Sequence, residues 1–578
     1  MSDLLGECEA VIAEHGALEQ CVSIEPRRSE NHDADLRLLF ADRLWLRSPA
    51  GAAMIAALRR HPAVAAAQRR KSAVALRFDD TTLAQLERRL AADGVADMQS
   101  SEMLDGRRFM VSFVGANTNK ALHVGHLRNI VLGEALASTL TAAGGSVQRH
   151  SLVGDIGRRV CEAMAGYLSC HDGQTPERAG LAGDRFVERC SRDCPREPVQ
   201  PDGMGEASEP NAEEREVRGD CADAIMQLWL QGAPAERALW HRMREWVMRG
   251  HRRTLARLGV SIDRYDYESL AIERALELVE DGLRRGLFER EPTGAAVYRT
   301  GRSEYTTMVL LRKDGVPTEY ARLLGLYDLI LEELDAEVDF IEVVGVEWQP
   351  AATAIGEALD ALRHGSGERL RWIYHGSVTV GGQKMGSSAG EVTWIEDLLD
   401  GIAASPGALA LQELAKGAVT PAQVADMVVR GSFLCSPFTQ SFAFFADRHV
   451  SAGRQGAGWT IAEAWCRAQH TSESRRAAPP VARTAVVQSQ LYRRSLSRSI
   501  ATLDTESLAS YLLGLCEACL ISPEPGPAAM AMLWRVLRSL GFTVGEPEVR
   551  HRDLPRAHDT GHLSLVHARG GRQICLRP

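Results

Sequence analysis

The sequence predicts an α/β protein that is built on a doubly wound parallel sheet. Strand, loop, helix and strand follow one another over residues 109–153, and nearly every pattern beyond about residue 400 is helical. Alternating β and α units are typical of a parallel sheet with helices on both faces. A chain of 578 residues holds two to four domains. The expected parts are a small α/β domain over 1–100, a Rossmann-like domain over 101–430 with an insertion near 170–220, and an all-α domain over 431–578.

The composition is that of an ordinary globular protein, with 45% hydrophobic and 25% charged residues. No apolar run approaches the roughly 20 residues that a membrane span needs. The first ten residues hold Asp3, Glu7 and Glu9 without a basic cluster, so they do not predict a secretory signal. Twelve irregularly spaced cysteines fit reduced thiols better than a disulfide framework. We therefore expect a cytoplasmic monomer that does not bind membranes.

The charge is unevenly distributed along the chain. The net charge is −9, yet residues 467–578 hold 15 Arg against 9 Asp plus Glu, which suits an anionic partner. Only five of the 67 basic residues are lysines. Because Lys is a compact point charge that fits between phosphate oxygens, each of these few lysines is a candidate for phosphate binding.

The N-terminal part mixes helical and strand patterns. Leu36, Leu39, Phe40 and Leu44 have helical spacing, which predicts a helix there. A strand is expected over 72–78, and a charged helix over 81–90. Together these elements predict a small α/β appendage.

A new pattern begins after residue 107. Residues 109–114 form a buried strand candidate, and apolar residues recur every four positions from Leu127 to Leu140, before Gly144. A second strand is expected over 147–153, followed by a turn and another helix. Much later, the strand-like residues 340–344 are expected to return to the same sheet.

Three further segments have distinctive compositions. Residues 195–216 contain four prolines among mostly polar neighbours, which predicts a flexible insert. Pro479 and Pro480 predict a hinge between helices, and residues 563–576 have weak strand character.

The first motif that carries chemistry lies where the strand 109–114 gives way to a helix. Residues 117–126 read Asn-Thr-Asn-Lys-Ala-Leu-His-Val-Gly-His. A helix N-terminus attracts phosphate through its free N–H groups, and Gly125 allows close approach of a nucleotide. His123 and His126 can donate to phosphate oxygens, although such a pair also occurs as helix caps or core residues.

The second motif is residues 381–390, Gly-Gly-Gln-Lys-Met-Gly-Ser-Ser-Ala-Gly. Its glycines predict a mobile loop, and Lys384 with two hydroxyls gives the loop a tip suited to a transition state with spreading phosphate charge. Alone, such a loop is usually only a surface loop. Both motifs together, in this order within one doubly wound fold, indicate a functional site much more specifically than either motif alone.

The two motifs resemble the HIGH and KMSKS signatures of class I aminoacyl-tRNA synthetases, and the arginyl-tRNA synthetase family in particular. Residues 116–128 are similar to S-P-N-x-x-K-x-x-H-V-G-H-L-R, and residues 153–157 to V-G-D-W-G. Residues 258–269 resemble L-G-V-x-F-D-x-Y-x-G-E-S, and residues 384–400 resemble K-M-S-S-R-K-G-N-V-V-T-L-D-D-L-L-D. The part from 447 to 541 looks like the linker and the helical anticodon-binding domain.

The resemblance implies activation of an amino acid by ATP and Mg²⁺, followed by transfer to tRNA. It implies catalytic roles for Lys120, His123, His126 and Lys384, and ATP contacts from these four and from Gly125, Met385 and Ser387. In family members whose second loop lacks its inner lysine, a lysine upstream of the first motif is thought to replace it, and Lys120 matches that replacement. It implies amino-acid contacts from Asn117, Glu268, Glu319, Leu323 and Trp348.

The amino-acid pocket departs from the family pattern. Residues 314–325 align without gaps onto D-G-T-x-T-Y-L-T-R-D-I-G, so the Tyr and Asp that hold a guanidinium become Glu319 and Leu323. Losing such a partner costs several kcal/mol in a buried site. Glu268 matches a family acid that faces the side chain, and Glu319 offers a neighbouring carboxylate.

Other candidate sites are weaker. The C-terminal arginines Arg475, Arg476, Arg493, Arg494 and Arg498 fit either phosphate contacts with tRNA or a solvated helix face. The spacing of Cys161, Cys170, His171, Cys190, Cys194 and Cys221 fits no standard zinc pattern, so we expect no metal site in the protein.

Three hypotheses remain open at this stage. The first is an arginine–tRNA ligase. The second is a paralogue that activates a different, cationic amino acid. The changes at Glu319 and Leu323 motivate it, together with Trp348, since residues 347–349 read Glu-Trp-Gln where the family has E-Q-S. The third is a non-catalytic tRNA-binding relative, although a pure binder has no need of the retained lysines and histidines.

Overall fold

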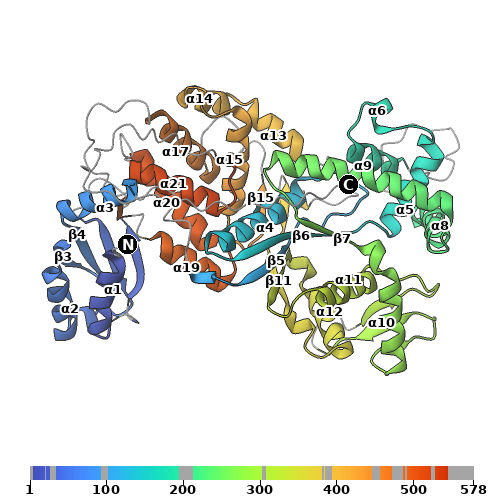
Figure 1. Cartoon of the computed structure of the whole chain (residues 1–578), viewed down its shortest axis with the longest axis horizontal. Helices are drawn as coiled ribbons and strands as arrows, with labels where there is room; N and C mark the ends of the chain where they lie inside the picture. The colour runs from blue at the N-terminus through green and yellow to red at the C-terminus, as the bar shows by residue number, and fades with distance from the viewer. Residues whose placement is uncertain are drawn as a thin grey trace, which may run out of the picture.

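The structure is a computed structural model in which three parts follow one another (Figure 1). The N-terminal α/β domain lies at the left, the helices that follow residue 393 lie in the middle, and the large parallel sheet lies to their right. No helix in the described ranges is long and apolar enough to cross a membrane. The described residues are 4–17, 19, 21–26, 34–92, 102–193, 212–301, 307–380, 383–384, 393–444, 456–471, 486–487, 491–521 and 527–544.

The central sheet has five parallel strands in the order β12-β11-β5-β6-β7. Its strands are β5 (Arg108–Ser112), β6 (Ser146–Val153), β7 (Arg264–Tyr267), β11 (Val338–Gly345) and β12 (Leu370–His375). Helix α4 (Val124–Ala142) returns the chain from β5 to β6, as the sequence predicts. The strand order reverses between β5 and β11, and doubly wound sheets bind ligands in the crevice at such a reversal.

A helical insertion with its own core separates β6 from β7. The ring of Phe186 packs edge-on against Trp246, and Trp229 packs edge-on against Trp240. The prediction of a flexible insert over 195–216 is wrong at its C-terminal end, because residues from Ala212 onward are helical. Residues 194–211 lie outside the described residues. The helices are α5 (Arg158–Gly166), α6 (Pro176–Ala179), α7 (Gly183–Arg192), α8 (Ala212–Leu230) and α9 (Pro234–Arg257).

A second unit precedes and follows β11. Buried residues from its helices, among them Leu324, Tyr327 and Ile355, pack in one hydrophobic cluster with Phe340 of β11. This unit consists of α10 (Ile272–Arg284), β8 (Glu289–Arg290), β9 (Ala296–Arg299), β10 (Thr307–Leu311), α11 (Glu319–Glu333) and α12 (Gln349–Leu362). It forms one wall of the crevice between β5 and β11.

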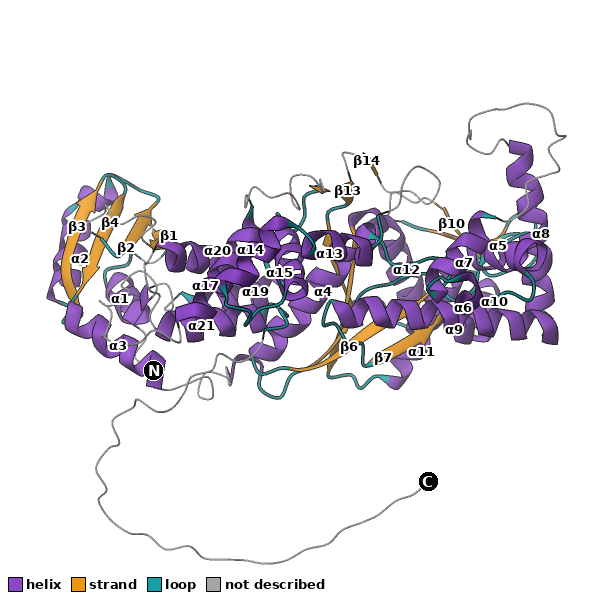
Figure 2. Cartoon of the chain, turned by 90° about the horizontal axis from the view of Figure 1, so that it is seen from above, coloured by secondary structure: helices purple, strands orange, loops and turns teal. Residues whose placement is uncertain are grey.

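The N-terminal domain is a four-stranded antiparallel sheet in the order β1-β2-β4-β3, visible at the left of Figure 2. The helix expected near residues 36–44 is wrong, because Leu36, Leu38 and Phe40 are buried on one face of a strand. The strand and the helix expected over 72–78 and 81–90 are confirmed. The elements are α1 (Leu4–Glu14), β1 (Cys21–Pro26), β2 (Leu36–Phe40), α2 (Pro49–Arg60), β3 (Val64–Arg70), β4 (Ala73–Phe78) and α3 (Asp80–Ala92).

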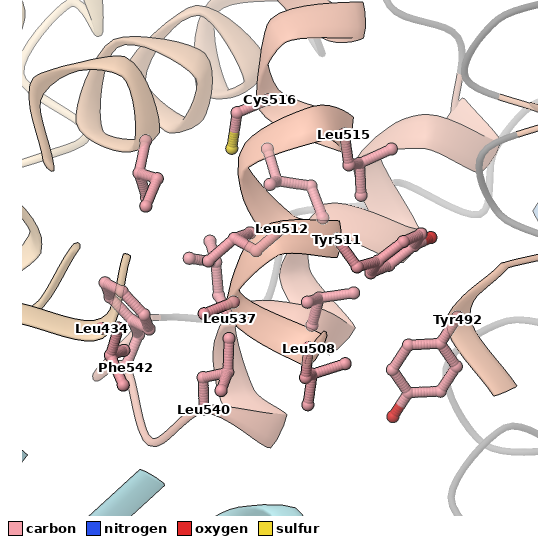
Figure 3. Packing of buried hydrophobic residues seen from close by; sticks show 14 of the residues in the cluster. Leu434, Tyr492, Leu508, Tyr511, Leu512, Leu515, Cys516, Leu537, Leu540 and Phe542 are labelled. Carbon is pink, nitrogen blue, oxygen red and sulfur yellow. The ribbon is translucent and has the colours of Figure 1, made fainter. Parts of the chain in front are cut away.

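The C-terminal part is mainly helical, as expected. Figure 3 shows Leu508 and Leu512 packed beside Leu537 and Leu540, and these four residues belong to one hydrophobic cluster. The expected hinge at residues 479–480 and the strand at 563–576 lie outside the described residues. The elements are β13 (Val378–Val380), β14 (Gln383–Lys384), α13 (Ile395–Ala403), α14 (Pro406–Leu414), α15 (Pro421–Leu434), β15 (Phe442–Phe444), α17 (Ala457–Thr471), α19 (Tyr492–Thr502), α20 (Glu506–Ile521) and α21 (Pro527–Ser539).

The helical part is tied directly to α4. The guanidinium of Arg128 is fully buried and donates to the backbone oxygens of Pro437 at 2.6 Å, Phe438 at 3.0 Å and Gln440 at 2.7 Å. Near the other end of α4, Thr139 Oγ1 donates to the Ser539 oxygen at 3.0 Å. These contacts hold the helix that starts at the first motif against the C-terminal helices.

Candidate active site

The two histidines of the first motif cap the N-terminus of α4. His123 is the N-cap residue, and its Nδ1 accepts from the Gly125 N–H at 3.1 Å. The His123 N–H in turn donates to Nδ1 of His126 at 3.2 Å, and the two ring centroids are 3.9 Å apart. Both rings are thereby held in place by the backbone at the start of the helix.

These hydrogen bonds decide the protonation state of both rings. Because each Nδ1 accepts a hydrogen bond, the ring proton of the neutral form is on Nε2. Burial, together with the nearby Lys120, lowers the pKa of His123 to about 3. Burial also lowers the pKa of His126, with further contributions from His123 and Lys120. Both residues are therefore neutral Nε2–H donors at pH 7.

Lys120 lies three residues before the helix cap His123. Burial lowers the pKa of its ammonium group, while Glu188 of α7 favours the charged form. The Lys120 carbonyl oxygen accepts a hydrogen bond from Nε2 of His251 on α9 at 2.9 Å. The helical insertion therefore holds Lys120 in place from two sides.

Chain segments on either side of the second motif are fixed near the first motif. After the motif, the Val124 N–H donates to the Thr393 oxygen at 3.0 Å, and the Ile395 N–H donates to the Leu122 oxygen at 3.2 Å. Before the motif, the Gly376 N–H donates to the Phe438 carbonyl oxygen, which also accepts a hydrogen bond from Arg128 of α4. Lys384 pairs with Thr379 in the β13–β14 hairpin, and residues 385–392 lie outside the described residues. The backbone thus brings the two motifs to one region of the molecule.

One carboxylate links the two motifs. Glu188 Oε2 accepts from the Trp394 indole N–H at 3.0 Å and from the Ala121 backbone N–H at 3.3 Å. The guanidinium of Arg185 lies 4.3 Å from the centroid of the Trp394 ring. Glu188 therefore positions both the backbone beside Lys120 and the segment that follows the second motif.

The resemblance to class I synthetases implies ATP use, and on that expectation the Glu188→Ala variant should lower the efficiency of ATP use by about 10- to 30-fold, because it removes two hydrogen bonds that position the motifs. The Glu188→Gln variant keeps an acceptor oxygen and should stay within about threefold of the native protein. Steady-state kinetics with varied ATP measure both values. Equal losses in the two variants would show that the charge matters and the hydrogen bonds do not.

A cavity of about 180 Å³ opens at the carboxyl ends of β5 and β11. The loop after β5 and the start of α4 form one side of it, and residues of α11, β11, α12 and β12 form the other. Gly125 and His126 line it, as do Asn117, Glu319 and Leu323. The cavity therefore joins the capped helix start to the region where amino-acid contacts are expected.

The cavity wall is acidic. Among the described lining residues, four are glutamates and none is Lys or Arg. Burial raises the pKa of Glu342 to about 8, and burial also raises the pKa of Glu319. The four glutamates are Glu268, Glu319, Glu342 and Glu347.

Glu268 differs from the other three because it already has a cationic partner. Its Oε2 accepts from Arg322 Nε at 2.7 Å, and both side chains are at most 8% exposed. Burial raises the pKa of Glu268 to about 7, whereas Arg322 favours its ionised form. An added cation in the cavity would therefore interact mainly with the remaining carboxyl groups.

Comparison with known proteins decides the family. The model of the family "tRNA synthetases class I (R), catalytic domain" matches residues 86–429, which is more than half of the chain. The chain belongs to this family. The class I synthetase signature therefore extends well beyond the two short motifs.

Individual relatives agree with this assignment. The arginine–tRNA ligase of Treponema pallidum is 31% identical over 301 residues, covering 52% of this chain and 49% of that protein. The arginine–tRNA ligase of Bacteroides fragilis is 29% identical over 342 residues, covering 58% and 57%. The chain thus spans about half the length of the curated relatives that it matches.

Solved synthetase structures share the fold. The Thermus thermophilus arginyl-tRNA synthetase has a TM-score of 0.59 at 18% identity, covering 93% of this chain and 97% of that one. The Plasmodium falciparum arginyl-tRNA synthetase has a TM-score of 0.57 at 13% identity, covering 93% and 96%. The class I synthetase fold that the sequence predicts is confirmed.

The structure brings most of the expected site residues of this class I synthetase together. Lys120, His123, Gly125 and His126 surround the start of α4. Of Lys384 only the backbone position is described, and Met385 and Ser387 lie outside the described residues. All five residues expected to contact the amino acid line the cavity: Asn117, Glu268, Glu319, Leu323 and Trp348.

Sequence reasoning missed several lining residues. Glu342 and Trp372 lie on neighbouring strands, and Tyr327 lies on the same face of α11 as Glu319 and Leu323. One signal for Glu342 is present in the sequence, since it is a charged residue inside an otherwise mostly apolar strand.

The described cysteines of the helical insertion differ in burial. Cys161 and Cys190 are buried in the core of the insertion, whereas Cys170 and Cys221 are exposed; Cys194 is not among the described residues. Within the part that the structure describes, no three His, Cys, Asp or Glu side chains form a group that could hold a metal ion.

Proposed function

We propose that this protein uses ATP to activate an amino acid with a cationic side chain, arginine in the first place, and transfers it to tRNA. The observation that carries this proposal is the single cavity that joins the capped start of α4 to a wall with four glutamates. A triphosphate suits the first end, and a guanidinium or ammonium group suits the second.

The proposed nucleotide end is the start of α4. A helix N-terminus attracts phosphate through its dipole and its free N–H groups. The neutral Nε2–H groups of His123 and His126 would add two donors there, and Lys120 and Lys384 would add positive charge. We assign further ATP contacts to Gly125, Met385 and Ser387. Mg²⁺ would bind the triphosphate and retain most of its waters, as it usually does in such sites.

The proposed amino-acid end is the acidic side of the cavity. Asn117 lies beside Gly154, where a Cβ would be 2.0 Å from its Oδ1 and 3.3 Å from Glu268 Oε1. Two acceptor oxygens at this point suit the α-ammonium group of a substrate, and the Asn117 amide nitrogen can donate to its carboxylate. Leu323 and Trp348 would contact its aliphatic stem, and Glu319 would face its charged end.

The proposed reaction needs no protein nucleophile. A carboxylate oxygen of the amino acid attacks the α-phosphorus of ATP, the bond to the bridging oxygen breaks, and pyrophosphate leaves. The protein would contribute by holding the two reactants together and by neutralising the charge that develops on the phosphates. The ester to tRNA would form in a second step, with AMP as the leaving group.

The proposed tRNA partner suits the basic C-terminal part. Arg493, Arg494 and Arg498 are exposed on α19, and Arg494 forms an ion pair with Glu9 of the N-terminal domain. Arg475 and Arg476 lie outside the described residues. Phosphate contacts of this kind weaken as salt rises, because binding releases counterions from the nucleic acid.

ATP–pyrophosphate exchange across the full panel of amino acids, with and without tRNA, tests the proposal. We expect exchange with arginine and none with neutral or acidic amino acids. Leu323 in place of a family Asp favours the second candidate, a synthetase for another cationic amino acid, and exchange with that amino acid alone would establish it. ATP binding without exchange for any amino acid would instead indicate a non-catalytic relative.

A further inference from the structure

Glu342 is a buried carboxyl group inside the central sheet. It lies in β11, paired with Ser112 of β5 on one side and with Trp372 of β12 on the other. The residue is only 4% exposed, and the preceding Phe340 and Ile341 are completely buried. Glu342 therefore lies next to β5, where the strand order of the sheet reverses, and it lines the cavity.

The protein compensates only in part for the burial of Glu342, through the side chain of Ser112 on β5, which favours the ionised form of the carboxyl group. Its Oε2 has no hydrogen-bond partner among the described residues. Arg322 is engaged by Glu268 at 2.7 Å and by the Pro317 oxygen at 2.8 Å. Because burial raises the pKa of Glu342 to about 8, the free protein holds it mostly as a neutral carboxyl group, and a bound cation would favour its ionised form. A buried polar group with an unpartnered oxygen is unfavourable, so a purely structural position would favour an apolar residue.

The surroundings of Glu342 suit an elongated side chain with a charged end. Leu323, Trp348, Ala352 and Ile355 give the cavity apolar walls. A substrate stem can pack along such walls, while its charged end meets the carboxyl group. A guanidinium presents two parallel N–H groups, which match the two oxygens of a carboxylate.

Glu342 is better placed for this role than the other carboxyl groups of the wall. Glu268 is already paired with Arg322, Glu347 is exposed to solvent, and Glu319 is only half-buried. An ion pair gains most in strength and in selectivity where water is excluded. Of these four groups, only Glu342 combines deep burial with an oxygen that has no partner.

We infer that Glu342 is the specificity-determining carboxylate that receives the cationic end of the amino-acid side chain. The inference rests on the proposed function and deepens it. Glu342 takes over the role of the carboxylate that is missing at Leu323, from strand β11 instead of helix α11. A neutral side chain of the same shape would leave this carboxylate without a partner, and the site would reject it.

The Glu342→Gln variant tests the inference because it removes the charge and keeps the volume. We expect the KM for arginine in ATP–pyrophosphate exchange to rise by about 100-fold, while the KM for ATP stays within about twofold. Citrulline has a neutral ureido group in place of the guanidinium. The preference for arginine over citrulline should therefore fall by about 100-fold or more.

A matched control comes from the amino end of the same strand. Glu337 precedes β11, its side chain is 88% exposed, and it pairs loosely with Arg108 at 3.5 Å. The Glu337→Gln variant should show native values for every substrate. Calorimetric titration of arginine into native and Glu342→Gln protein gives a second measurement that does not depend on turnover.

The outcomes separate the two claims. An unchanged KM and an unchanged arginine preference in Glu342→Gln would overturn the inference and leave the proposed function standing. Native protein that exchanges with no cationic amino acid would overturn the proposed function, and the inference with it. If Glu342→Gln does not fold, Glu342→Met removes the carboxyl group at a similar volume, and a native arginine preference in that variant would also overturn the inference.

Discussion

The Lys120→Ala variant is expected to lower the rate of amino-acid-dependent ATP–pyrophosphate exchange by about 10²- to 10³-fold. Lys120 lies beside the capped start of α4, and Glu188 and His251 hold it there. Its ammonium group would neutralise phosphate charge as pyrophosphate leaves. Because this charge is greatest in the transition state, the loss should appear in kcat more than in the KM for the amino acid.

The chain offers a matched control for this experiment. Lys313 is exposed in the turn after β10, away from the cavity, so Lys313→Ala should show native exchange. Thermal unfolding of both variants shows whether each one is folded. A Lys120→Ala protein that is folded and retains more than about a third of native exchange would contradict the proposed role of Lys120.

Replacement of His123 by alanine is the second large expected effect, about 10²-fold in exchange rate. The variant loses the Nε2–H donor and also the N-cap acceptor for Gly125, whose loss costs about 1 kcal/mol of stability. The His123→Asn variant restores a cap acceptor, since Asn is a favoured N-cap residue. Exchange kinetics and melting temperatures together separate the two roles of His123.

The two variants should therefore behave differently. We expect His123→Asn to recover stability without recovering full activity. Full recovery of both stability and activity in His123→Asn would show that His123 acts only as a helix cap.

The pH dependence provides an independent check on His123. Its pKa is about 3 in the folded protein, well below the ordinary value of 6.5, so the ring stays neutral at pH 5–8. The exchange rate should therefore show no step from this residue in that range. The unfolded chain binds a proton at this histidine below about pH 6.5, so the contribution of the neutral ring to stability is lost as the pH falls towards 3. Native protein should lose more stability than His123→Asn on acidification.

Local patterns were enough to predict the core of the fold. The strands near residues 109–114, 147–153 and 340–344 and the helix that follows the first motif have clear apolar periodicity, and the structure contains all four. The N-terminal error has a simple cause. Leu36, Leu39 and Phe40 fit a helical period, but the alternation of Leu36, Leu38 and Phe40 decides the outcome because it places all three in the core.

The candidate site could be predicted only in part. The two motifs could be predicted because each carries a recognisable arrangement of Lys, His and Gly. The hydrogen bond between Trp394 and Glu188 could not be predicted, because it joins segments that are far apart in the sequence. Glu342 stands within a strand, and nothing in its neighbours shows that the strand ends at a cavity. The position of each of these residues becomes informative only after the sheet has assembled.

The central claim is that one cleft binds a nucleotide at the start of α4 and a cationic side chain at its acidic wall. Calorimetric titration with a non-hydrolysable arginyl-sulfamoyl adenosine tests this claim most directly, with the alanyl analogue, arginine and AMP as comparisons. We predict that the arginyl compound binds at least about 10³-fold more tightly than arginine or AMP alone, and far more tightly than the alanyl compound. Equal affinity for the two analogues, or no gain over the separate fragments, would contradict the account.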